Sequence, residues 1–187
     1  VTKTNHQFAL EELQKEFKRS KEIFIKDHRN RYPRKDADAW KILEVASMGT
    51  LSKLYKNLNH QLPEKALIAK DMGLNLSSEL SSWLEAMAYV RNIIAHHSRL
   101  WSRNMVKRPS LNINNPQNDW FLPLFISSNK YNKKPFLIIS AMIYLSNKVT
   151  PNHQVKSKIL ELINDNPKVP IYKLGFFKNW EKQPLWK

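Results

Sequence analysis

The chain has 187 residues, 42% of them hydrophobic, and it contains no cysteine. Its 31 basic and 16 acidic residues give a net charge of +15. The length suits one domain with a sizeable core, and the lack of cysteine excludes disulfides and thiolate metal sites. Such an excess of positive charge favours a polyanionic partner, with nucleic acid ahead of an anionic membrane surface.

The composition also indicates a fold class. Only three glycines occur and alternating strand patterns are scarce, so the sequence predicts an all-α fold.

No apolar run reaches the length of a membrane span, and the first ten residues lack the apolar core of a signal peptide. We therefore expect no membrane partner and a cytoplasmic location. The first residue is valine, which suggests a fragment or a processed chain.

The N-terminal segment, residues 1–35, is predicted to be a basic helix over residues 8–31. Leu10, Leu13, Phe17 and Phe24 form its apolar face, and Pro33 ends the segment. The basic face fits a solvated surface, part of an RNA-binding surface or a surface for a partner helix. Its basic residues are Lys15, Lys18, Arg19, Lys21, Lys26, Arg29 and Arg31.

The predicted core segment covers residues 36–150. Asp38 is placed to cap a helix over residues 39–58, with Trp40 and Leu43 among the residues expected to face the core. Pro63 opens a short helix that runs to Met72 and is closed by Gly73.

A central helix follows over residues 78–102, with Ser77 or Ser78 as its N-cap. Its polar positions recur every three or four residues, which places them in one stripe along the helix. Asn92 and His96 therefore lie one turn apart on the same face, and Arg91 is next to it. The apolar stripe consists of Leu80, Leu84, Met87, Val90, Ile94 and Trp101, and the polar stripe of Glu85, Tyr89, Asn92, His96, Arg99 and Arg103.

The polar stripe combines an imidazole, an amide and guanidinium groups, which suit a phosphate ester. Histidine transfers protons near neutral pH, and arginine binds phosphate through a planar bidentate contact. A metal is not expected, because His96 and His97 are adjacent and point about 100° apart on a helix. The sequence has no H-E-x-x-H, and no carboxylate lies within four residues of either histidine. We expect no metal and no cofactor.

The remaining third of the chain is less regular. Residues 103–134 are predicted to be irregular, and WFLPLFI (120–126) fits a short strand or a loop packed on the core. Pro135 begins an apolar helix to about Lys148. The last segment, residues 151–187, is expected to contain a helix over 152–164 and an aromatic tail. The tail aromatic residues, expected to pack on the bundle, are Phe176, Phe177, Trp180 and Trp186.

Two strings resemble a known family. RNIIAH (91–96) is similar to the R-N-x-x-x-H form of the motif of HEPN ribonucleases, and RNIIAHHSRLWSRN resembles the signature of AbiD/AbiF-type abortive-infection proteins. The ending LGFFKNWEKQPLWK (174–187) resembles that family's C-terminus. The resemblance runs roughly from Trp40 to Lys187 and is weaker upstream. It implies that the chain is the C-terminal part of such a protein, with an additional N-terminal region missing.

The resemblance implies a HEPN-like helical bundle and metal-independent cleavage of RNA in bacterial defence against phages, as a toxin restrained until infection. The substrate 2′-OH would be the nucleophile and a 2′,3′-cyclic phosphate a product. Arg91, Asn92 and His96 would be catalytic, with His97 in support. Two copies would pair to form a composite site. Additional RNA contacts are expected from Arg99, Arg103, Lys107 and Arg108.

Two alternatives remain. The chain fits an RNA-binding module without cleavage activity, or a helical protein-interaction domain. The assignment of the catalytic histidine also has an alternative, because Arg91 to His97 satisfies the longer R-x(5)-H spacing. His96 is preferred because it shares the face of Asn92.

Overall fold

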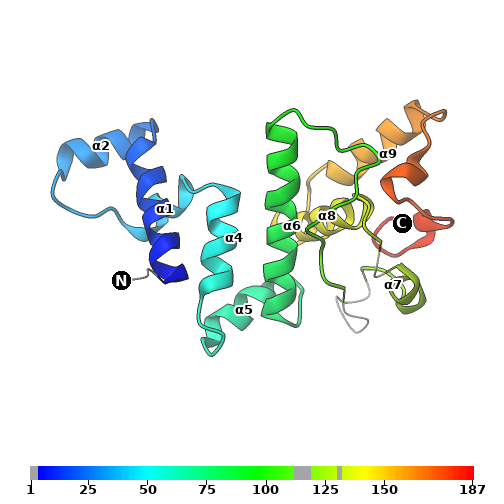
Figure 1. Cartoon of the computed structure of the whole chain (residues 1–187), viewed down its shortest axis with the longest axis horizontal. Helices are drawn as coiled ribbons and strands as arrows, with labels where there is room; N and C mark the ends of the chain where they lie inside the picture. Colours follow the sequence, from blue (N-terminus) through cyan, green and yellow to red (C-terminus); the bar gives the residue numbers. More distant parts are fainter. Residues whose placement is uncertain (1–3, 112–118, 130–131) are drawn as a thin grey trace. The chain divides into compact units, whose positions relative to one another are not determined.

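The computed structural model describes residues 4–111, 119–129 and 132–187. These residues contain α-helices and short 3-10 helices and no strand, which confirms the predicted all-α class (Figure 1). Contacts divide the chain into two compact units, residues 1–59 and 60–187, and each is described on its own. The expectation of a single domain stays a prediction.

The first unit contains four helices within residues 4–59, the part of it that the structure describes. They are α1 (Asn5–Arg19), α2 (Ile23–Arg31), α3 (Ala39–Glu44) and α4 (Met48–Asn57). Helix α1 packs against α4 and α3, and it buries Ala9, Leu13 and Glu16 (Figure 1).

The single helix predicted over residues 8–31 is wrong, because the chain breaks between α1 and α2. Ser20 has extended backbone, with φ −61° and ψ 135°. The Arg29 guanidinium donates to the Lys18 carbonyl at 2.8 Å and to the Ser20 carbonyl. These carbonyls at the end of α1 would otherwise need water, so Arg29 stabilises the break by satisfying them.

The helix predicted over residues 39–58 is also two helices. Ser47 begins α4 as its N-cap and accepts from the Thr50 N–H at 3.2 Å. The buried Glu16 carboxylate accepts from the Ser47 N–H at 2.7 Å and from the Thr50 hydroxyl at 3.0 Å. A carboxylate at a helix N-terminus is favourable, so this contact from α1 fixes the break.

Helix α3 does not face the core as predicted. It has no buried residue, and Trp40 is 61% exposed while stacking on Phe24 with ring centroids 6.2 Å apart. Asp38 makes no side-chain cap and instead pairs with Lys41 at 2.8 Å.

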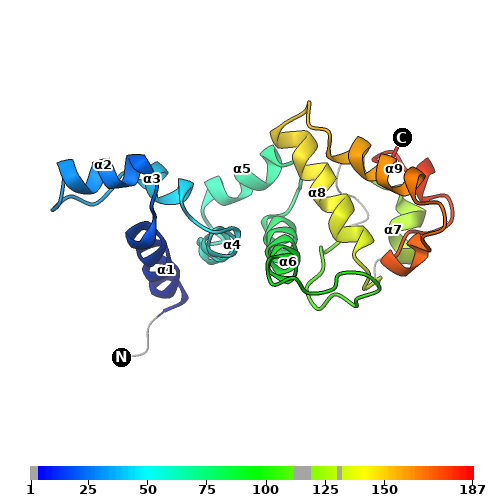
Figure 2. The same ribbon diagram turned by 90° about the horizontal axis from the view of Figure 1, so that it is seen from above.

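The second unit contains five α-helices and two 3-10 helices in the described residues. They are α5 (Pro63–Asp71), α6 (Ser77–Ala95), α7 (Pro123–Asn129), α8 (Phe136–Val149), α9 (Val155–Asp165), η1 (Ile171–Leu174) and η2 (Trp180–Lys182). Helix α6 packs against α5 and α8, and α8 packs against α9 (Figure 2). The N-cap of α6 is Leu76, without a side-chain cap, rather than the predicted serine.

The predicted end of α5 is confirmed. Gly73 has φ 76°, and its N–H donates to the Lys70 carbonyl while the Leu74 N–H donates to the Ala69 carbonyl. This pair of bonds is the Schellman arrangement, in which glycine is favoured because φ is positive. The Tyr144 hydroxyl of α8 donates to the Gly73 carbonyl at 3.0 Å.

Aromatic rings fill the core of the second unit. Trp120 is fully buried, with its ring centroid 4.9 Å from that of Trp83 and 5.3 Å from that of Tyr144. Trp120 is thus a core residue. The predicted strand or loop at residues 120–126 is wrong in part, because Pro123 begins α7. Proline is favoured in the first turn of a helix, so Pro123 was a signal for the start of α7. The apolar residues around it favoured a strand or a packed loop instead.

The expected packing of the aromatic tail is confirmed. Phe136 of α8 lies with its ring centroid 4.6 Å from that of Phe176 and 5.7 Å from that of Trp186. The Trp186 indole donates to the Ser140 hydroxyl at 3.2 Å, and the Leu185 N–H donates to the Trp120 carbonyl at 3.0 Å. The tail is therefore part of the core.

Candidate functional site

The predicted site residues gather at the C-terminal end of α6. Arg91 and Asn92 lie in its last turns, and the helix ends at Ala95, so the predicted extension to residue 102 is wrong. His96 is the C-cap, with φ −93°, and its N–H donates to the Asn92 carbonyl at 3.1 Å. His96 thus follows Asn92 by one turn, although it stands just beyond the helix.

A Schellman arrangement ends the helix. The His97 N–H donates to the Ile94 carbonyl at 2.9 Å, and the Ser98 N–H donates to the Ile93 carbonyl at 3.0 Å. His97 occupies the position that glycine usually takes and has φ 51°. A non-glycine residue in this left-handed region costs roughly 1–3 kcal/mol, and such positions cluster at functional sites. Ser102 and Asn179 also have positive φ, but of these residues only His97 lies at the end of α6, and the sequence indicated it only as a supporting residue.

Replacing His97 by glycine is expected to stabilise the protein by about 1 kcal/mol, because glycine adopts positive φ without steric cost. A chain of this size should then unfold about 2–4 °C higher. His97→Ala is the matched control, since alanine removes the imidazole but keeps the strained Cβ. Thermal unfolding of both variants measures the difference. A glycine variant no more stable than the alanine variant would contradict strain at this position.

Beyond His97 the chain is a loop fixed by several contacts. The buried Met105 packs on Ala86, Val90 and Ile93 of α6, and its N–H donates to the Lys133 carbonyl at 2.6 Å. The loop therefore keeps Arg99 and Arg103 near the end of α6, although neither belongs to the helix stripe predicted for them. The contact with Lys133 is long-range and has no signal in the sequence.

The basic residues of the site differ in their contacts. Lys107 pairs with Glu85 at 2.6 Å, so part of its charge is neutralised. Arg103 is half-buried, and its guanidinium donates to the Arg99 carbonyl at 3.4 Å. Arg99 is exposed, and its side chain has no partner among the described residues. Arg108 is half-buried and interacts within the chain.

Asn92 contacts Arg91 rather than a histidine. The Arg91 guanidinium donates to the Asn92 side-chain carbonyl at 3.2 Å, and both residues are exposed. The His96 side chain is exposed and has no hydrogen-bond partner in the described part of the chain. Asn92 is therefore suited to orient Arg91, and nothing within the described residues of one chain orients the His96 ring.

The charge around the site favours an anion. Residues 86–118 contain no aspartate or glutamate but include five basic residues, which are Arg91, Arg99, Arg103, Lys107 and Arg108. The C-terminal end of a helix carries partial negative charge and repels phosphate, so these side chains must supply the attraction. Within the ranges that the structure describes, no three residues of His, Cys, Asp and Glu gather closely enough to hold a metal ion.

The comparisons with known proteins assign a family. The sequence profile of the family described as Abi-like protein matches residues 1–102. The chain belongs to the Abi-like protein family. The match includes Arg91, Asn92, His96 and His97, and it takes in residues 1–39, where we had expected only a weaker resemblance. The C-terminal string 174–187 lies outside it.

No curated protein and no solved structure matches the chain. Membership of the Abi-like family suggests a role in abortive infection, a bacterial defence against phages. None of the helices in the described residues is both long and apolar enough to cross a membrane.

Proposed function

We propose that this Abi-like protein is a metal-independent endoribonuclease of the HEPN type that acts in the bacterial cytoplasm during abortive infection. The observation that carries the proposal is the placement of Arg91, Asn92 and His96 at one exposed end of α6, in a stretch, residues 86–118, that has five basic residues and no aspartate or glutamate. This set can bind a phosphodiester and transfer protons, and it includes no carboxylate, the usual anchor for a divalent cation.

The proposed reaction is an internal transesterification of RNA. The 2′-OH loses its proton and attacks the adjacent phosphorus, which forms a 2′,3′-cyclic phosphate. The bond to the 5′-oxygen breaks, and that oxygen takes up a proton to leave as a 5′-OH. His96 acts as the general base or acid, and Arg91 stabilises the negative charge on the phosphoryl oxygens. Asn92 holds the Arg91 guanidinium in place.

Two copies of the chain complete the site in this proposal. The reaction requires one group to remove a proton and another to donate one, whereas a single chain offers an unoriented His96. An isologous two-fold contact would bring both α6 ends together and supply the second histidine. His97, held in its strained conformation, supports the site in this proposal and does not replace the second chain's His96.

The proposal is tested by incubating the purified full chain with a mixed-sequence RNA in excess EDTA. Cleavage is expected to persist, and light scattering on the same preparation should give the mass of a dimer. Loss of cleavage in EDTA that returns with a divalent cation would contradict the metal-free reaction. A cleaving monomer would contradict the composite site.

An RNA-binding module without cleavage is the second candidate, and the lack of a partner for the His96 side chain favours it. Catalytic histidines are commonly held by a hydrogen bond. Tight RNA binding by a dimer that never cuts the RNA would select this candidate.

A further inference from the structure

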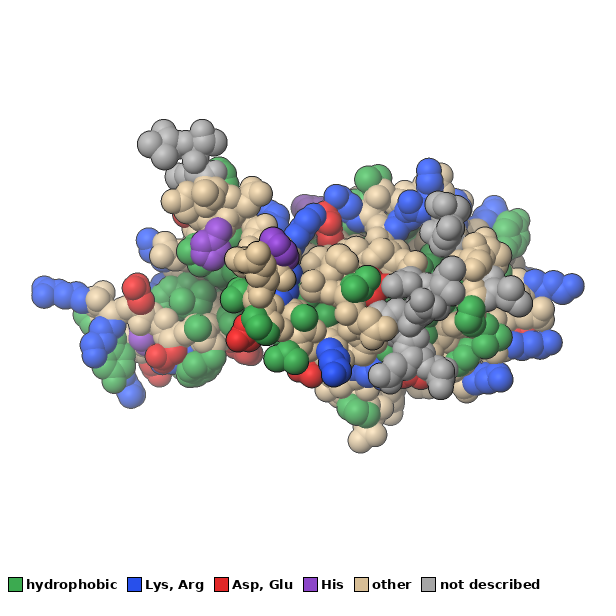
Figure 3. Space-filling model, turned by 90° about the horizontal axis from the view of Figure 1, so that it is seen from below, with side chains coloured by type: hydrophobic (Ala, Val, Ile, Leu, Met, Phe, Trp, Pro, Cys, Tyr) green, Lys and Arg blue, Asp and Glu red, His purple; other side chains and the backbone are tan. Residues whose placement is uncertain are grey.

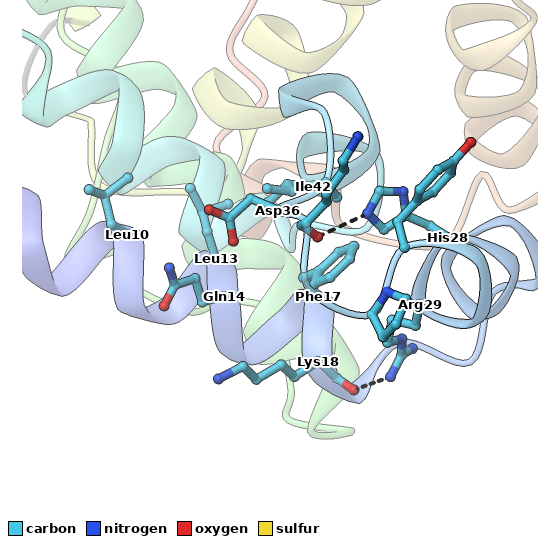
Figure 4. A pocket seen from close by; sticks show the side chains of 13 residues that line it. Leu10, Leu13, Gln14, Phe17, Lys18, His28, Arg29, Asp36 and Ile42 are labelled. Atoms are coloured by element: carbon cyan, nitrogen blue, oxygen red, sulfur yellow. Dashed lines mark hydrogen bonds between the residues drawn. The ribbon is translucent and has the colours of Figure 1, made fainter.

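The first unit contains a pocket that the proposed cleavage site does not use. It has a volume of about 490 Å³ and lies between α1, α2 and the segment that leads to α3 (Figure 4). Small-molecule sites typically enclose about 300–1,000 Å³, so the pocket is large enough for a ligand the size of a nucleotide. We infer that it binds a single nucleotide, with a guanine base as the preferred occupant.

Aromatic rings line one wall of this nucleotide pocket. The ring centroids of Phe17 and His28 are 6.2 Å apart, and those of His28 and Tyr32 are 5.5 Å apart. The His28 ring is fixed, since its Nε2 lies 3.3 Å from the Lys35 carbonyl oxygen. Tyr32 is 47% exposed, so its ring is accessible. An exposed aromatic ring beside apolar side chains such as Leu13 suits the flat face of a base.

Two polar side chains on the lining have no partner among the described residues. They are the Gln14 amide and the Asp36 carboxylate, which is the one carboxylate of the lining. Guanine presents two adjacent N–H donors on its Watson–Crick edge, which fit the two oxygens of one carboxylate. Uracil offers a single donor there, between two carbonyl oxygens that a carboxylate repels. Asp36 therefore selects guanine over uracil.

Basic side chains at the pocket can hold the phosphate. Lys35 lies with its ammonium nitrogen 5.6 Å from the Tyr32 ring centroid, and Lys18 also lines the pocket. Arg29 is engaged with backbone carbonyls, so the two lysines are the available cations. Residues 1–59 hold 13 basic and 8 acidic residues, a balance of 13 − 8 = +5 that favours an anionic ligand.

A wholly apolar occupant fits less well. It would remove Gln14 and Asp36 from water without offering them hydrogen bonds, which is unfavourable. Figure 3 shows exposed apolar side chains on the first unit with basic and acidic side chains among them. At the pocket, the basic Lys35 lies beside the aromatic Tyr32, and basic with aromatic side chains are typical of surfaces that bind single-stranded nucleic acid. The nucleotide can be a free molecule or part of an RNA strand, because base and phosphate are the same in both.

Calorimetric titration of the full chain with GMP, UMP and inorganic phosphate tests the inference. A second arm uses two oligouridines that are 2′-O-methylated throughout, one of which carries a single guanine. The proposed cleavage reaction cannot cut either of them, because it needs a free 2′-OH. GMP is expected to bind at least about tenfold more tightly than UMP or phosphate. Binding of GMP identifies a free nucleotide as a ligand, whereas a guanine preference confined to the oligonucleotides identifies a strand.

Substitutions distinguish nucleotide binding at this pocket from nonspecific attraction by the positive charge of the unit. Asp36→Asn should remove most of the preference for GMP over UMP. Tyr32→Ala should weaken the binding of GMP and of UMP about equally. Asp27→Asn is the matched control, since it removes one carboxylate of the same unit outside the pocket lining. Thermal unfolding of each variant checks the fold. The inference is overturned if neither arm shows a guanine preference, or if Asp36→Asn and Asp27→Asn have the same effect.

Discussion

Replacing His96 by alanine is expected to abolish RNA cleavage while leaving RNA affinity within about twofold of the unaltered protein. General acid–base catalysis contributes roughly 10²–10⁴-fold to a rate, and the exposed His96 ring adds little to phosphate attraction beside five basic residues. Single-turnover cleavage with saturating protein measures the rate, and a filter-binding titration measures the affinity.

His97→Ala is the control for the choice of histidine. The two residues are adjacent, but His96 is the C-cap of α6 and His97 is the strained residue after it. If His97 has a supporting role, His97→Ala should lower the cleavage rate less than His96→Ala does. An inactive His97→Ala together with an active His96→Ala would show that the general acid or base is His97, while the proposed reaction itself would stand.

Replacing Arg91 by alanine should lower the cleavage rate by about 10²–10³-fold, the loss typical of removing one donor to a developing negative charge. Arg91→Lys should recover only part of the rate, because an ammonium group lacks the planar pair of donors and cannot keep the same contact with Asn92. The rate at saturating protein is the relevant quantity, since it separates catalysis from binding.

Arg99→Ala is the matched control for Arg91→Ala. Arg99 is exposed and lies in the loop after α6, where we assign it to RNA binding. Its removal should raise the protein concentration needed for half-maximal cleavage and leave the saturated rate unchanged. Equal effects of the two substitutions on the saturated rate would contradict the separate roles of Arg91 and Arg99.

Local sequence patterns predicted most of the helical content but missed the ends of α1, α3 and α6. The apolar spacing and Gly73 placed α5, and Pro135 placed α8, because these signals act within a few residues. The breaks near Ser20 and Ser47 depend on Arg29 and Glu16, whose contacts are 9 and 31 residues distant in sequence. A helical periodicity continues across such breaks and cannot reveal them.

The candidate site shows the same limit. The spacing of Asn92 and His96 was sufficient to place them one turn apart, and the structure keeps that relation. It could not show that α6 ends at Ala95, because the usual stop signal is glycine and this chain has His97 there. Nor could it reveal the nucleotide pocket, which brings Gln14 of α1 near Asp36.

The most direct test of the central proposal is cleavage of an RNA carrying a single 2′-deoxy substitution at a mapped cleavage position. The reaction is run in excess EDTA beside the all-ribose RNA, and the product ends are identified by mass spectrometry. The proposed 2′-OH attack predicts no cut at the deoxy position, and cyclic-phosphate and 5′-OH ends from the all-ribose substrate. Cleavage at the deoxy position would show that water is the nucleophile and would contradict the mechanism assigned to Arg91 and His96.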